Sequence, residues 1–137
     1  MKIPAFQIDA FTDQPFSGNP AAVCPLDKWL PEEAMQSIAA EMNLSETAFF
    51  VPSEKQNIDY EIRWFTPTVE VDLCGHATLA SGHVVFSKLE PNLDQVAFSS
   101  RSGRLTVERQ NGMLELDFPS NPPSPLQNRD EVAAVES

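Results

Sequence analysis

The sequence predicts an α+β fold in which a strongly curved antiparallel sheet wraps around a central helix. Residues 72–89 read as a helix that is apolar or small almost all round, with no charge between Asp72 and Lys88. Such a helix offers solvent no polar stripe and must be enclosed by other elements. The chain also holds about seven or eight short alternating segments and a second helical segment with one apolar face. A sheet curved around this helix buries both the helix and the apolar face of the sheet.

The strands are predicted from alternating apolar positions. The predicted strands are residues 3–11, 46–51, 58–65, 69–73, 96–99, 104–109 and 113–118, together with the short apolar segment 21–24. Residues 21–24 are expected to pair beside the first strand. Gln110-Asn111-Gly112 separates the last two segments, and Asn-Gly is among the stronger signals for a hairpin turn. Most neighbouring strands are therefore predicted to form hairpins.

The second helix is predicted from Pro31 to about Asn43. Proline just inside the start, followed by Glu32 and Glu33, matches the preferences of helix N-termini. The apolar residues at helical spacing are Met35, Ile38, Ala39 and Met42. One apolar face predicts a helix on the outside of the sheet.

Length and composition indicate one globular domain. The 137 residues include 42% hydrophobic and 21% charged residues, which excludes disorder as the default. A net charge of −11 argues against nucleic acid and anionic membrane surfaces as partners. The two cysteines lack metal-like spacing, and the N-terminus has no signal-peptide pattern. A cytoplasmic setting is expected, with residues 1–120 as the domain and 121–137 as a linker or the start of a missing second domain.

The start of the apolar helix is the first candidate site. Cys74-Gly75-His76 places unpartnered backbone N–H groups and the positive end of the helix dipole where a substrate carboxylate could bind. Cys74 is expected to have a lowered pKa there and to serve as an acid/base or nucleophile. The alternative is that Cys74 is a small buried apolar residue and Gly75 simply a turn.

Glu46 is the second candidate. It lies between the amphipathic helix and an apolar strand, where partial burial would suit a carboxylate for proton transfer. A solvated turn glutamate is the alternative. His76 could hydrogen-bond either the substrate or this glutamate. Residues 17–20, which include Asn19, could form a ligand loop or merely a turn.

Three motifs together resemble the phenazine-biosynthesis-like (PhzF) family, which is related in fold to diaminopimelate epimerase. They are FTDQPFSGNPAAV, MNLSETAFF and DLCGHATLASG, and the resemblance covers the chain but only about half of the family's usual length. It implies an antiparallel β-barrel around a central helix, paired with a second such domain across the active site. It also implies Glu46 as the catalytic acid/base and Gly75 and His76 as substrate-binding residues. Asn19, which lies in the first motif, is our further expectation for a substrate-binding residue. Cys74 occupies the place of a catalytic cysteine of the related epimerases.

The leading hypothesis is a cofactor-independent isomerase that moves a proton on a small carboxylate-bearing metabolite, without a metal. An epimerase or racemase that uses Cys74 is the runner-up. A non-catalytic binding or assembly domain that lacks half of the site is the third hypothesis. Because one wall of such a site would be missing, the 137-residue chain is expected to be inactive alone or to form a homodimer.

Overall fold

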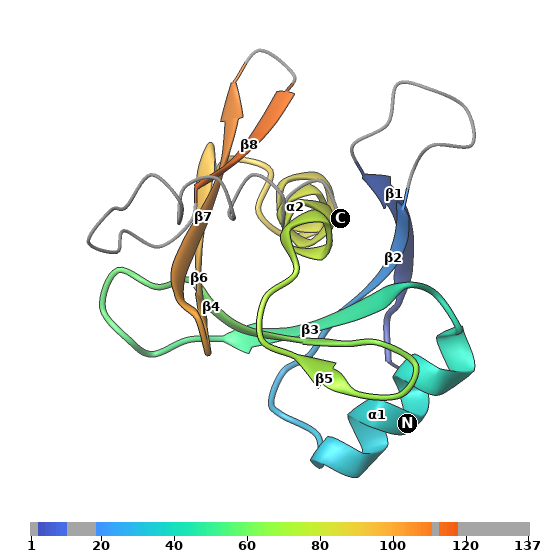
Figure 1. Cartoon of the computed structure of the whole chain (residues 1–137). Helices are drawn as coiled ribbons and strands as arrows, with labels where there is room; N and C mark the ends of the chain where they lie inside the picture. Colours follow the sequence, from blue (N-terminus) through green and yellow to red (C-terminus); the bar gives the residue numbers. More distant parts are fainter. Residues whose placement is uncertain (1–2, 11–18, 111–112, 118–137) are drawn as a thin grey trace, which may run out of the picture.

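A computed structural model describes residues 3–10, 19–110 and 113–117. Figure 1 shows a curved sheet with one helix inside it and another outside. The strands are β1 (Phe6–Ala10), β2 (Asn19–Pro25), β3 (Glu46–Pro52), β4 (Tyr60–Phe65), β5 (Glu70–Val71), β6 (Gln95–Ser100), β7 (Gly103–Gln110) and β8 (Met113–Asp117). The helices are α1 (Glu32–Met42), α2 (Gly75–Val84) and the π-helical turn η1 (Val85–Leu89). These segments agree with the predicted ones apart from small differences at their ends.

The sheet is mixed, whereas the sequence predicted an antiparallel one. Its order is β1-β2-β3-β4-β6-β7-β8, with β5 pairing on β4. β2 pairs with β3 in parallel, and so does β4 with β6. In each case a helix lies in the connection, which is the kind of crossover that parallel strands require. The prediction of an antiparallel sheet was therefore wrong. Alternation of apolar residues indicates which face of the sheet a side chain occupies, but it carries no information on the direction of the neighbouring strand.

Helix α2 lies inside the curve of the sheet, as predicted. β1 and β8 are the two ends of the described sheet, so the strands form a half-barrel around the helix (Figure 1). All residues of α2 except His83 are buried. Gly82 lets the helix approach β7 closely, because a Cβ there would lie 2.6 Å from Cγ1 and 2.9 Å from Cβ of Val107. The helix begins at Gly75 rather than earlier because Cys74 has an extended backbone, with φ −144° and ψ 106°.

Helix α1 covers the outer face of the sheet, also as predicted. A second cluster of buried residues holds it there, formed by Cys24, Met35, Ala39, Phe49 and Phe65. The helix ends at Asn43, which has a left-handed backbone (φ 53°) and whose N–H donates to the carbonyl of Ala39 at 3.1 Å. This conformation is a common helix ending that asparagine tolerates.

The end of the chain is described only in part. β7 and β8 pair up to Gln110 and Met113, as the predicted hairpin requires, while the turn residues 111–112 lie outside the described residues. The predicted linker, residues 121–137, also lies outside them. Among the described residues, no helix has the length and apolar character needed to cross a membrane.

Candidate active site

The N-terminus of α2 is held by its own first turn. The backbone N–H and the hydroxyl of Thr78 both donate to the carbonyl of Cys74, at 3.1 and 2.7 Å. No acidic residue lies in this first turn. The remaining N–H groups of the turn and the positive end of the helix dipole are therefore not neutralised from within the helix.

Glu46 reaches this helix start from the first residue of β3. Ala48 and Phe50, which follow at alternate positions, pack in the core cluster around α2, so Glu46 belongs to the same face of the strand. Its side chain is 20% exposed. The expectation of partial burial is thus confirmed.

The structure brings Glu46, Cys74 and His76 together, although Glu46 and Cys74 are 28 positions apart in the sequence. Oε1 of Glu46 lies 2.8 Å from Nε2 of His76, and Sγ of Cys74 lies 3.6 Å from Nδ1 of the same ring. The contact between Nε2 and Oε1 is short but is not aligned as a hydrogen bond. Catalytic hydrogen bonds are often poorly aligned before a substrate binds, so the distance is the more informative quantity.

The pKa of Cys74 is raised, whereas the sequence predicted that it would be lowered. Burial and the neighbouring Glu46 carboxylate raise the pKa of the thiol to about 12. The backbone N–H groups of Ala77 and His76 favour the thiolate, as a helix N-terminus should, but they are outweighed. The prediction was wrong because it counted the helix start and not the desolvation or the facing carboxylate. At neutral pH Cys74 is therefore a protonated thiol.

The structure describes Gly75 fully but Asn19 only by its backbone. Gly75 is the first residue of α2 and is buried between Cys74 and His76. Asn19 begins β2 two residues before Ala21, and Ala21 pairs with Glu46. The backbone of Asn19 is consequently at the same end of the sheet as the site, while its side chain lies outside the described part.

A group of charged residues holds β5 and the residues that follow it, just before Cys74, against β4. Arg63 on β4 donates to both carboxylate oxygens of Glu70, from Nε at 2.8 Å and Nη2 at 2.7 Å. Arg101 contacts Glu70 at 2.9 Å and Asp72 at 3.4 Å. These hydrogen bonds hold the pKa of Glu70 below its ordinary value, with Arg63 the main cause. Sequence reasoning missed this group, because Arg63 is one of several charged residues in the predicted strand and nothing local distinguished it.

The donor atoms of Glu46, Cys74 and His76 lie within 4.8 Å of one another. A thiol, an imidazole and a carboxylate are donors that zinc accepts. The same closeness also suits direct hydrogen bonding among the three groups, as the Cys74–His76 contact shows.

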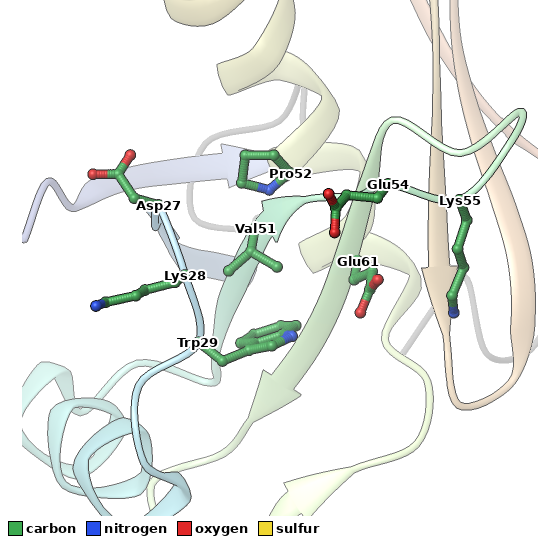
Figure 2. A pocket seen from close by; sticks show the side chains of 8 residues that line it. All are labelled: Asp27, Lys28, Trp29, Val51, Pro52, Glu54, Lys55 and Glu61. Carbon is green, nitrogen blue, oxygen red and sulfur yellow. The ribbon is translucent and has the colours of Figure 1, made fainter.

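A separate hollow of about 460 Å³ lies away from these three residues. Its lining comes from the segment after β2, the end of β3, the loop that follows it and the start of β4. Figure 2 shows the Trp29 ring near Val51 and Glu61, with Lys28 and Lys55 on opposite sides of the group. None of Glu46, Cys74 or His76 lines this hollow.

Comparison with known proteins identifies the family. Residues 8–136 match the family described as Phenazine biosynthesis-like protein (PhzC-PhzF). The chain belongs to this family.

Individual relatives agree. An uncharacterized isomerase of Pseudomonas aeruginosa is 54% identical over 95% of this chain and 49% of its own length. A crystal structure of a PhzF family protein from Enterococcus faecalis superposes with a TM-score of 0.78 at 46% identity, over 94% of this chain and 50% of that one. A predicted epimerase from Pseudomonas aeruginosa, at 22% identity and a TM-score of 0.69, covers 89% of this chain and 46% of its own and shares the fold. The chain spans about half the length of the relatives it matches.

Proposed function

We propose that this protein is a cofactor-independent isomerase that moves a proton between carbons of a small carboxylate-bearing metabolite. The observation that carries the proposal is the contact of Glu46 with His76 at the start of a buried helix, at 2.8 Å. Membership in a family whose relatives include proteins named isomerases supports the reaction class. In a protein of the full length of these relatives, we propose that the residues described here form one wall of the active site.

Glu46 is the acid/base in this proposal. It is partly exposed, so a substrate can reach it, whereas His76 is 3% and Cys74 8% exposed. The raised pKa of Cys74 leaves no appreciable thiolate to act as a base. Glu46 removes a proton from one carbon of the substrate and returns it to another, which leaves the enzyme unchanged after each turnover.

The start of α2 holds the substrate carboxylate. Gly75 and His76 contribute backbone N–H groups of the first turn, and that turn contains no acid to compete with the substrate. Negative charge that develops next to the carboxylate when the proton leaves is stabilised at the same place.

The geometry disfavours a two-base racemase built from these residues. Two bases on opposite faces of one carbon must stand roughly 6 Å apart, about twice the reach of a proton transfer. Glu46, Cys74 and His76 lie within 4.8 Å of one another and so approach a substrate from one side. A proton shift between two carbons on one face needs only one base, which agrees with Glu46.

A substrate held only by α2 and Glu46 would remain open to water. We therefore propose that the second wall comes from the rest of a full-length protein or from a second copy of this chain. Sedimentation analysis beside the activity assay tests this part. A strictly monomeric 137-residue protein with full turnover would show that no second wall is needed.

Deuterium exchange in D₂O tests the reaction itself. Small unsaturated carboxylates are incubated with the protein, and proton NMR follows loss of the exchanging C–H signal. Glu46→Gln should lower exchange by at least about 10²-fold, because the amide cannot accept the proton. The matched control is Glu41→Gln on the exposed face of α1, which should exchange at the original rate. Equal exchange in both variants would remove Glu46 as the acid/base.

A further inference from the structure

Each of the two nitrogens of the His76 ring faces a neighbouring side chain. Nε2 lies 2.8 Å from Oε1 of Glu46, and Nδ1 lies 3.6 Å from Sγ of Cys74. The ring is buried, with 3% of its surface exposed. A buried neutral imidazole carries one proton, and its two neighbours decide which nitrogen holds it.

A carboxylate oxygen accepts hydrogen bonds, so a ring proton on Nε2 suits the contact with Oε1 of Glu46. Nδ1 then has a lone pair and needs a donor. Cys74 supplies one, because its thiol keeps its proton in this environment. In this arrangement the thiol proton faces the lone pair on Nδ1, and the Nε2 proton faces the carboxylate, so each donor has one acceptor. The opposite tautomer would turn the Nε2 lone pair toward the Glu46 carboxylate.

We propose that Cys74 is a positioning residue whose S–H donates to Nδ1 of His76 and thereby fixes the tautomer that presents Nε2–H to Glu46. Cys74 does not touch the substrate in this arrangement. It acts through the histidine, as partners that fix a histidine tautomer do in other sites.

The consequence for proton transfer rests on the proposed function. When a substrate binds, the Nε2–H group aligns with the nearby Oε1 of Glu46, which leaves the second carboxylate oxygen for the substrate. A lone pair on that oxygen takes the proton as the C–H electron pair moves into the substrate. The same oxygen then gives the proton to the other carbon and becomes ionised again. His76 and Cys74 keep their protons throughout, and no further reactant is needed.

Nitrogen NMR of ¹⁵N-histidine-labelled protein tests the tautomer directly. The chain has two histidines, and the exposed His83 is assigned by His83→Gln. The correlations between ring nitrogens and ring protons distinguish the two neutral tautomers and the imidazolium. We expect the tautomer of His76 that carries its proton on Nε2. A proton on Nδ1, or an imidazolium, would overturn the proposal.

Variants separate a positioning role from a merely structural one. Cys74→Ala removes the donor to Nδ1 and should shift the Nδ1 resonance of His76 and weaken the preference for the Nε2–H form, which Glu46 still favours; Cys74→Ser keeps a donor and should restore the original signals at least in part. Cys24→Ala is the matched control, since Cys24 is also buried but lies in the other core cluster. It should leave the pattern unchanged. Unaltered His76 ring-nitrogen signals in Cys74→Ala, in a protein whose fluorescence from the buried Trp64 shows that it is folded, would refute the role.

The tautomer can be measured without turnover, so this test does not depend on the proposed reaction. If no carboxylate exchanges deuterium but His76 is the Nε2–H tautomer and responds to Cys74→Ala, the proposed function fails and the positioning role stands. Where exchange is observed, Cys74→Ala should lower kcat about 10- to 100-fold with little change in KM. Cys74→Ser should stay within about tenfold of the original rate.

Discussion

Replacing Gly82 with alanine should destabilise the fold, although alanine is the better helix former. In a helix interior alanine is favoured over glycine by about 1 kcal/mol. Here the new Cβ would stand 2.6 Å from Cγ1 and 2.9 Å from Cβ of Val107, distances at which side-chain atoms must move. Val107 is buried and β-branched, and β7 is held on both sides by β6 and β8, so neither its rotamer nor its backbone yields easily.

The size of the effect follows from these two opposing contributions. Forcing a methyl group into filled space costs typically about 1–3 kcal/mol, and contacts this short belong at the upper end. After the helix preference is subtracted, Gly82→Ala should lose about 2 kcal/mol of unfolding free energy. Denaturation by urea, followed by tryptophan fluorescence, measures this as a lower midpoint at an unchanged slope. Trp64 is fully buried and reports on the core.

A double-mutant cycle identifies the contact responsible. Val107→Ala alone removes buried methyl groups and should cost about 1–3 kcal/mol. In the double variant the alanine at 82 occupies the space that Val107 leaves, so the total loss should fall short of the sum by at least about 1 kcal/mol. Additive losses, or a Gly82→Ala protein as stable as the original, would show that α2 does not need this close approach.

Two further predictions concern titratable groups. The lowered pKa of Glu70 means that its contacts with Arg63 stabilise the fold above pH 4.5, the ordinary pKa of glutamate, and weaken as the pH falls below that value. The difference in unfolding free energy between the original protein and Glu70→Gln should therefore be full at pH 7 and shrink on acidification. A difference that does not depend on pH would contradict the ion pair. Burial raises the pKa of both Cys24 and Cys74 to about 12, so at pH 8 about one thiol in 10⁴ is ionised and neither should react rapidly with a thiol reagent until the protein is unfolded. A fast-reacting thiol that disappears in Cys74→Ala would refute the environment described for the site.

Local patterns in the sequence were sufficient for the main elements of the fold. Residues 72–89 have no polar face, and an all-apolar helix of this length can only be stable when it is enclosed, so its central place could be predicted. One-sided periodicity equally placed α1 on the outside. Glu46 and His76 were named as site residues from the motifs, and a contact between them was one of two roles expected for His76.

Tertiary structure alone decided what depends on neighbours distant in sequence. The parallel pairing of β2 with β3 and of β4 with β6 follows from how the helical connections cross the sheet, which alternation within a strand does not record. The direction of the pKa of Cys74 was decided by burial and by the Glu46 carboxylate, two effects that require coordinates and that outweigh the helix start visible in the sequence. The Arg63–Glu70 contact likewise arises only when β4 and β5 pair, because antiparallel pairing of short strands sets residues from different segments side by side.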